Sequence, residues 1–273
     1  MGGTVQGILK IWHSLPMSLR ISIIGLLQKN ERLYGRFLRL YRWQLFRRVD
    51  ARDNANGLHG KLPPAALRYR VGASSDADTF VSIGKTCAGD IQSALLKVSR
   101  DVDSFRQILD FGCGCGRTLI HLSSLAPNAQ FYGTDIDADA IEWCQQNLRF
   151  GTFSVSRETP PIQYASNTFD FIFAISVFTH LNEDYQFRWL EELYRIAQSG
   201  AILLVTVDSS FVGDQGFIFE KTYEKGLFPA WYQNASHSKE YVFANFSSFF
   251  EVLDYLPRGM NNHQDVVVLQ KKK

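Results

Sequence analysis

The pattern of apolar and polar positions predicts an α/β fold built around residues 107–143. A short apolar run at residues 107–111 predicts a buried strand, and the apolar positions 119, 120, 122 and 125 that follow have roughly helical spacing. A second strand is predicted at residues 131–134 and ends at Asp135. This order is typical of a unit that binds a nucleotide: a strand, a glycine turn, a helix, and a second strand that ends at an acidic residue.

The same patterns continue along the chain. Helices are predicted at residues 77–98, 138–150 and 183–198, and strands at residues 152–155, 169–176 and 201–207. Asp170 enters the strand at 169–176, and Ser199 with Gly200 predicts a turn before the strand at 201–207. Strands alternating with helices favour a parallel sheet with helices on both faces.

The N-terminal part has a different pattern. Residues 17–49 alternate apolar and basic positions at helical spacing, which predicts one or two basic amphipathic helices with Pro16 at the start and Asn30 as a possible break. Residues 50–61 are polar and turn-rich and predict a linker. We therefore divide the chain into an extension with its linker, residues 1–61, and a main domain, residues 62–273.

Charge separates the same two parts. Residues 1–60 carry ten Lys or Arg against three Asp or Glu, a net charge of +7, and the remainder carries nineteen against twenty-four, a net charge of −5. The basic helices fit a solvated face packed on the domain, an anionic membrane surface, a cap over the active site, a second subunit or other partner, or an anionic substrate. An acidic main domain argues against nucleic acid as the partner.

Composition predicts a globular chain in a reducing compartment. With 273 residues, of which 45% are apolar, the chain can bury a substantial core. Cysteines 87, 113, 115 and 144 show neither metal-ligand spacing nor a disulfide framework, so we predict no metal and a cytoplasmic location. No apolar run reaches 18 residues and no signal peptide is recognisable, so we expect no export, with peripheral membrane association as one alternative.

The glycine turn narrows the class of ligand. Gly112, Gly114 and Gly116 have the spacing G-x-G-x-G after Asp110, whereas the dinucleotide fingerprint is G-x-G-x-x-G. Glycines let the backbone approach a ligand closely and point N–H groups at it. Asp135 can accept hydrogen bonds from ribose hydroxyls. A nicotinamide oxidoreductase is therefore disfavoured.

The run from Asp110 to Gly116, DFGCGCG, resembles the first motif of the class I S-adenosylmethionine-dependent methyltransferases, and residues 133–136, GTDI, resemble their ribose-binding second motif. The likeness covers residues 63–271. It implies a methyltransferase with S-adenosylmethionine as cofactor and S-adenosylhomocysteine as product. It also implies a Rossmann-like, seven-stranded, mostly parallel sheet whose last strand, in a closing hairpin, is antiparallel. The cofactor-binding residues expected from it are Asp110, Gly112, Gly114, Gly116, Asp135, Ile136, Ala174 and Ser176.

A narrower likeness lies ahead of the glycine motif. Pro63-Pro64, Leu-Arg-Tyr-Arg-Val-Gly at residues 67–72, Phe80 and Gly84 resemble a subgroup of bacterial small-molecule and sugar methyltransferases. The resemblance implies that this segment folds over the methionine end of the cofactor and that Arg70 pairs with its carboxylate; a surface position is the alternative. In the family an acid often reads adenine after the third strand, but here Ser154, Ser156 and Arg157 precede Glu158.

Two histidines are candidate bases for the acceptor. Ligands of open α/β sheets lie outside the carboxyl ends of the strands, so residues 176–180 should border the site and His180 is placed to take a proton. Its alternative role is to order the loop or to cap the helix at Asn182. The subgroup likeness adds His237, inside an aromatic-rich insertion at residues 208–246 that we interpret as a lid or acceptor pocket.

We expect the acceptor to be a hydroxyl of a small molecule or sugar. A small amine is the alternative acceptor, and a non-catalytic module that binds S-adenosylmethionine is the alternative class of protein.

Overall fold

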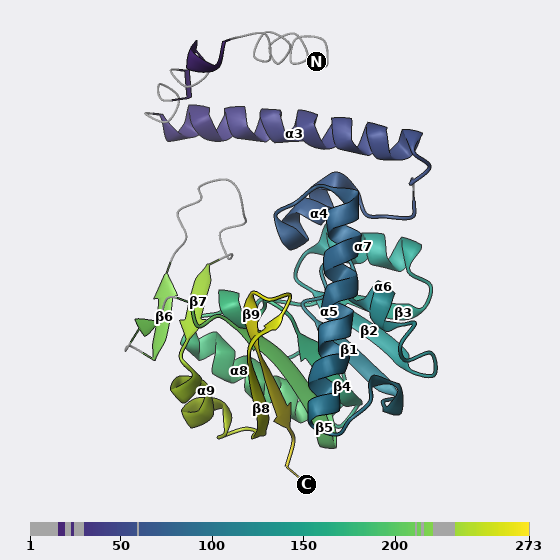
Figure 1. The fold of residues 1–273 in the computed structure, drawn as a ribbon, viewed down its shortest axis with the longest axis vertical. Coiled ribbons are helices and arrows are strands. Elements are labelled where there is room, and N and C mark those ends of the chain that lie inside the picture. Colours follow the sequence, from purple (N-terminus) through teal and green to yellow (C-terminus); the bar gives the residue numbers. More distant parts are fainter. Residues whose placement is uncertain are drawn as a thin grey trace.

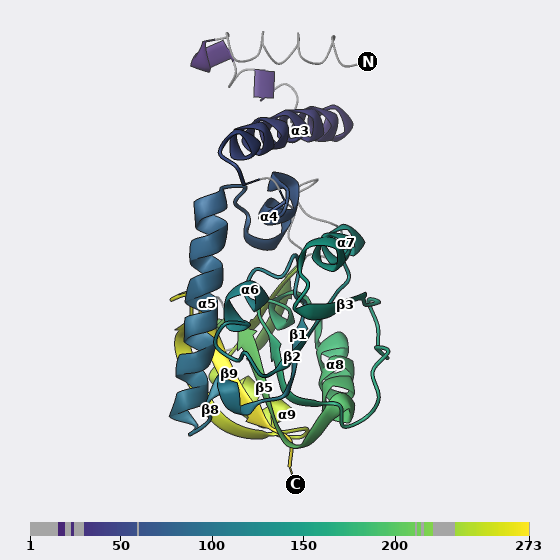
Figure 2. The ribbon, with the colours of Figure 1, turned by 90° about the vertical axis from the view of Figure 1, so that its right-hand side faces the viewer.

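The chain folds into three layers, with one twisted sheet between two layers of helices (Figures 1 and 2). The structure, a computed structural model, describes residues 16–19, 23–24, 30–58, 60–210, 212–213, 216–220 and 233–272. Seven strands lie in the order β3-β2-β1-β4-β5-β9-β8. The pairings from β3 to β5 are parallel, whereas β9 is antiparallel to both of its neighbours. The predicted sheet with its antiparallel last strand is confirmed.

The strands of this sheet are β1 (Gln107–Phe111), β2 (Gln130–Asp135), β3 (Gly151–Val155), β4 (Phe169–Ala174), β5 (Ala197–Val207), β8 (Glu251–Met260) and β9 (Gln264–Gln270). A separate two-stranded ribbon pairs β6 (Phe217–Glu220) with β7 (Asn234–His237). The described helices of the domain are α4 (Ala65–Gly72), α5 (Ala77–Lys97), α6 (Leu119–Leu122), α7 (Ala138–Asn147), α8 (Glu183–Ile196) and α9 (Lys239–Phe246), with short 3-10 helices η1 (Val102–Ser104) and η2 (Phe178–His180).

Alternation along the central strand divides the core. Phe171 and Phe173 of β4 face the cluster that α5, α6 and α7 complete, whereas Ile172 and Ala174 face the cluster of α8 and α9. Alternate side chains of a strand point to opposite faces of the sheet. Because both faces of β4 are covered, both sets of side chains are apolar, which explains the nearly continuous apolar run in the sequence. The sheet edge at the strands' carboxyl ends is thereby held between two packed layers.

Two predicted boundaries are corrected. The turn at Ser199 and Gly200 lies inside β5, because Gly200 has φ +77° and the β4–β5 register shifts beside it, so the pair forms an irregularity within a continuing strand. The polar segment 50–61 is not a linker throughout, since helix α3 (Glu31–Ala55) continues to Ala55. Asn30 caps this helix by accepting a hydrogen bond from Leu33 N.

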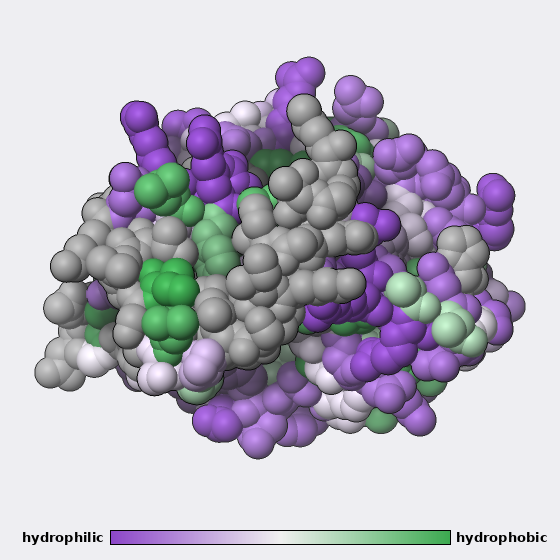
Figure 3. All heavy atoms as spheres, turned by 90° about the horizontal axis from the view of Figure 1, so that it is seen from above, coloured by the Kyte–Doolittle hydropathy of each residue, from purple (hydrophilic) through white to green (hydrophobic). Residues whose placement is uncertain are grey.

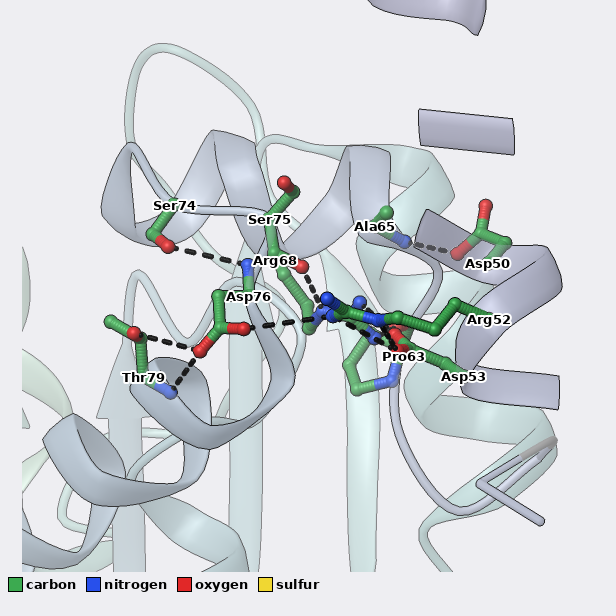
Figure 4. Close-up of polar contacts among 10 residues, drawn as sticks. All are labelled: Asp50, Arg52, Asp53, Pro63, Ala65, Arg68, Ser74, Ser75, Asp76 and Thr79. Atoms are coloured by element: carbon green, nitrogen blue, oxygen red, sulfur yellow. Dashed lines mark hydrogen bonds and ion pairs between the residues drawn. The ribbon is translucent and has the colours of Figure 1, made fainter. Parts of the chain in front are cut away.

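Helix α3 crosses the end of the domain beside α4 (Figures 1 and 2). Its C-terminal turn is fixed by buried Arg68 of α4, which pairs with Asp53 and donates to the carbonyls of Ser75 and Pro63 at 2.9 and 2.8 Å (Figure 4). Asp50 also accepts a hydrogen bond from Ala65 N at 2.7 Å. Helix α3 is therefore anchored to the wall of the domain. In the described ranges, no helix has the length and apolarity needed to cross a bilayer.

Candidate active site

A cavity of about 950 Å³ opens at the carboxyl ends of the parallel strands. Its walls include the C-terminal end of α4, the turns after β1, β2, β3 and β4, residues of α5 and α8, the ribbon β6–β7, and the turn between β8 and β9. These segments are far apart in the sequence. The sheet topology brings them together at the edge where ligands of such folds bind.

The glycine turn forms the floor of the cavity. Gly112, Gly114 and Gly116 have φ values of +83°, +52° and +75°, which side chains rarely adopt. A Cβ on Gly114 would lie 2.6 Å from Val71 of α4, and one on Gly116 would lie 2.6 Å from Leu148. Gly112 and Gly114 line the cavity, whereas Gly116 lies outside its wall and serves close packing beneath the turn.

Asp135 joins the two motifs. One carboxylate oxygen accepts a hydrogen bond from Gly114 N at 2.6 Å, and the other accepts one from Asp137 N at 2.8 Å. Burial raises the pKa of Asp135 above its ordinary value, and the two backbone donors oppose that rise. Asp135 and Ile136 both line the cavity. The carboxylate that the sequence assigns to ribose is thus held rigidly at the edge of the turn.

Asp110 and Arg117 are two further ionisable residues at the floor of the cavity. Asp110 is buried, and its pKa is raised well above the ordinary value by burial and by the nearby Asp135 carboxylate, while Arg117 acts to lower it. The Arg117 Nε atom is buried without a hydrogen-bond partner among the described residues. Sequence reasoning missed Arg117, although its place directly after the last glycine of the motif was a usable signal.

Arg117 is closely enclosed by two glycines. A Cβ on Gly72 would come within 2.5 Å of Arg117 Nη1, and a Cβ on Gly84 would overlap the Arg117 backbone carbonyl. Gly84 was part of the quoted resemblance, and its close approach to the turn gives that position a physical reason.

Arg70 lines the cavity but already has two acidic neighbours. Its Nε atom lies 2.9 Å from Asp137 Oδ2, and its Nη2 atom lies 3.0 Å from Asp139 Oδ2. A cofactor carboxylate would therefore compete with these two side chains for the guanidinium. The assignment of Arg70 to that carboxylate stays a prediction, and Arg117 is a second candidate for it.

Ala174 and Ser176, the two cofactor-binding residues expected near the end of the strand at 169–176, lie in different surroundings. Ser176 lines the cavity in an unusual backbone conformation with φ +58°; its N–H donates to Thr206 Oγ1 at 2.7 Å and its hydroxyl to Gln264 Oε1 at 2.9 Å. Ala174 is fully buried inside β4 and lies outside the cavity wall. Its side chain therefore serves the core.

His180 lies on η2 and lines the cavity. Its Nδ1 atom lies 2.6 Å from the carbonyl oxygen of Gln233, and a carbonyl only accepts, so Nδ1 carries the proton and Nε2 holds the lone pair. Burial lowers the pKa of His180 below its ordinary value, although the bond to Gln233 opposes this. The imidazole is thus neutral at neutral pH and oriented as a hydrogen-bond acceptor through Nε2.

His237 is placed differently. The ring is fully buried outside the cavity wall, among Phe217, Tyr241 and Phe246. Its Nε2 lies 2.9 Å from Gln186 Oε1, and burial lowers its pKa to about 4. The structure does not bring the two histidines together at one site. We interpret His237 as a link between β7 and α8.

Two further groups of residues line the cavity. Ser156, Arg157 and Glu158 line it after β3, where the sequence departs from the acid with which the resembled family often reads adenine, whereas Ser154 contacts the Tyr164 hydroxyl at 3.3 Å and does not line it. The second group is a set of polar side chains that sequence reasoning missed: Asn182, Asp208, Glu220, Asn234, His263 and Gln264. Of the aromatic insertion, Phe211, Tyr223, Phe228, Trp231 and Tyr232 lie outside the described residues.

The residues present suit an adenosyl cofactor. Gly112 and Gly114 bring the backbone to the cavity without a side chain, and backbone donors hold the Asp135 carboxylate beside them. Asp110 and Asp135 provide carboxyl groups for a cationic ligand, and Arg70 and Arg117 provide guanidinium groups for a carboxylate.

Comparisons with known proteins agree with this geometry. A family described as a methyltransferase domain matches residues 109–203. An S-adenosylmethionine-dependent methyltransferase of Clostridium acetobutylicum superposes with a TM-score of 0.55 at 12% identity, over 76% of this chain and 98% of that one. A methyltransferase of Aquifex aeolicus gives 0.51 at 19%, over 77% and 100%. The 1,6-didemethyltoxoflavin-N1-methyltransferase of Burkholderia thailandensis, solved with 1,6-didemethyltoxoflavin and S-adenosylhomocysteine, gives 0.53 at 16%, over 77% and 88%.

At these identities the structural likeness shows the fold, and the family match falls on the residues from β1 into β5 that hold the glycine turn, Asp135 and His180. The part of the chain that matches the methyltransferase-domain family and the sheet topology shared with the solved S-adenosylmethionine-dependent methyltransferases both point to the same edge of the sheet.

Proposed function

We propose that the acceptor is a hydroxyl group of a small molecule or sugar and that His180 is the base that receives its proton. The observation that carries the proposal is the bond between His180 Nδ1 and the Gln233 carbonyl, because it leaves Nε2 unprotonated on a ring that lines the cavity. A hydroxyl is a weak nucleophile and needs a proton acceptor as it attacks, whereas a neutral amine does not.

S-adenosylmethionine supplies a methyl group on a positively charged sulfur. The chain's own residues would hold and orient it: the glycine turn and Asp135 at the adenosine, and Arg70 or Arg117 at the carboxylate. Because charge is lost at sulfur during transfer, the main work of the cavity is to align two reactants and to exclude water. The polar groups of Asn182 and Asn234 suit a hydroxylated acceptor next to His180.

Amine transfer is the second candidate. Asp208 and Glu220 both line the cavity, and two carboxylates there would attract a cationic amine. One structural neighbour is named as an N1-methyltransferase. An amine acceptor would leave His180 as a positioning residue rather than a base.

The first test is calorimetric titration of the purified chain with S-adenosylmethionine and, separately, S-adenosylhomocysteine. Asp135→Ala should weaken binding by about 1.5–3 kcal/mol, because a charge-assisted contact to ribose is lost. Asp78→Ala is the matched control, since Asp78 is exposed on α5 and lies outside the cavity wall. Equal loss in both variants would contradict the assignment of Asp135 to ribose.

The acceptor is then identified by S-adenosylhomocysteine release with matched panels of sugars, phenols and amines, and by the site of the added methyl group in the product. Release with hydroxyl compounds supports the proposal, and release with amines alone supports the second candidate. Tight cofactor binding without release in any panel would favour a non-catalytic binding module.

A further inference from the structure

We propose that one face of α3 binds an anionic lipid surface. The face consists of Arg32, Leu33, Arg36, Arg39, Leu40, Trp43 and Arg47, called here the arginine face. These positions recur at intervals of three or four residues, so they share one side of the helix. The inference concerns the extension of the chain and does not depend on the identity of the acceptor.

The arginine face is exposed where a soluble helix would usually be covered or polar. Leu33, Leu40 and Trp43 expose 50%, 44% and 44% of their surface, and the four arginines between them are also exposed. Figure 3 looks down on this end of the molecule, where apolar residues reach the surface among hydrophilic ones. Aliphatic and indole groups beside arginines are the combination that interfacial helices use.

The contact of α3 with the domain uses another side of the helix. Phe46 packs against Tyr69 of α4 with ring centroids 5.4 Å apart, and Arg42 lies over the same ring. At about 100° per residue, the middle of the arginine face lies roughly a quarter-turn away from these two residues. Docking of α3 on α4 therefore leaves the arginine face available.

The positive charge of the arginine face indicates what kind of surface it binds. Residues 32–48 hold six arginines and no acidic residue. In the described part of the chain, none of Arg32, Arg36, Arg39 and Arg47 forms an ion pair with a carboxylate, and Arg47 instead stacks over the Trp43 ring at 4.7 Å. Guanidinium groups complement phosphate, and an indole belongs at the level of lipid headgroups. An anionic bilayer satisfies both, whereas an acidic polymer would leave the leucines exposed.

The test is flotation of the full chain with vesicles of phosphatidylcholine, alone or mixed with phosphatidylglycerol. Wild type should bind the mixed vesicles and not the neutral ones. Replacing Arg32, Arg36, Arg39 and Arg47 together by Gln should lower partitioning into mixed vesicles by about ten-fold or more. Trp43→Ala should lower it without changing the charge.

A matched control removes the same charge from the body of the domain, at the exposed residues Lys85, Lys97, Arg100 and Arg149, and should float like wild type. Unchanged calorimetric binding of S-adenosylmethionine shows that each variant is folded. Equal flotation of the two four-fold variants would overturn the proposal, since net charge alone would then explain binding. Binding to a DNA duplex without flotation would overturn it as well.

Discussion

At the scale of single residues, the site depends on carboxyl groups that the fold keeps partly or wholly out of water. Asp110 is the extreme case, because burial and Asp135 raise its pKa well above the ordinary value. A raised pKa means that folding favours the protonated form: the contribution to stability is complete below the unfolded-state pKa and is lost as pH rises through the folded-state pKa. Each unit of the rise corresponds to about 1.4 kcal/mol.

Asp110→Asn should therefore raise the melting temperature at neutral pH and have little effect near pH 4, where the carboxyl group is already protonated. It should also weaken S-adenosylmethionine binding by about ten-fold, because a carboxylate facing a cationic ligand is lost. Thermal unfolding at two pH values and calorimetry measure the two effects. A variant less stable than wild type at neutral pH would show that Asp110 is ionised and paired.

The pKa of His180 is shifted in the opposite direction from that of Asp110. Burial lowers its pKa, so the neutral, basic form persists to pH values below the ordinary 6.5 and the transfer rate should fall only when pH drops below that range. With a hydroxyl acceptor, His180→Ala should lower kcat by about 10²- to 10⁴-fold while cofactor affinity stays constant. His121→Asn, away from the cavity wall, is the control. Unchanged turnover in His180→Ala would assign the base elsewhere.

At the scale of elements, α3 is joined to the domain through a buried ion pair. Arg68 and Asp53 are only 2% and 5% exposed, so removal of one partner leaves a charge in a site that water does not reach. Asp53→Ala should lower the free energy of unfolding in urea by about 3–5 kcal/mol. Arg52→Ala, which removes pairs that an exposed guanidinium makes with Asp53 and Asp76, should cost at most about 1 kcal/mol. If the two variants lost similar amounts of unfolding free energy, the Asp53–Arg68 pair would have to be accessible to water rather than buried.

Elements with a strong local pattern were predictable from the sequence. The strand at 107–111 has the predicted bounds, and the glycine turn and Asp135 follow it as expected, because period, turn chemistry and spacing agree there. The prediction of a turn at Ser199 and Gly200 was wrong, because a glycine with a positive φ can form an irregularity within a strand as well as a turn. The prediction of a linker at residues 50–61 was wrong because Asp50 and Asp53 bond to α4 rather than to solvent, and the sequence does not show that these residues have such partners.

The site was predictable only where its residues lie close together in the sequence. Tertiary packing decided the rest: Gln264 and His263 reach the cavity because β9 runs antiparallel beside β5, with Val207 opposite Asp265. His180 was predicted from its position after the strand at 169–176, and His237 was a second candidate from the subgroup likeness alone. His237 was removed from the cavity by a ring environment drawn from β6 and α9.

At the scale of the whole molecule, the cavity is where three distant parts of the chain meet: α4, the glycine turn, and the turn between β8 and β9. The sheet itself is held by two packed layers, so its amides should exchange slowly with or without ligand. The wall segments border the cavity, so a bound ligand would add contacts to them. A ligand that touches all three should therefore couple their local opening.

Binding of S-adenosylhomocysteine should slow amide hydrogen exchange in α4 from Ala65 to Gly72, in residues 112–118 and in residues 260–264, because opening of any of these would break ligand contacts. The far end of the hairpin, near Glu251, should be unaffected, since it lies away from the cavity. Exchange followed by mass spectrometry on the free and saturated chain measures this. Protection confined to residues 112–118 would mean that α4 and the β8–β9 turn border the cavity without contacting the ligand, and the arginine that binds its carboxylate would then be Arg117 rather than Arg70.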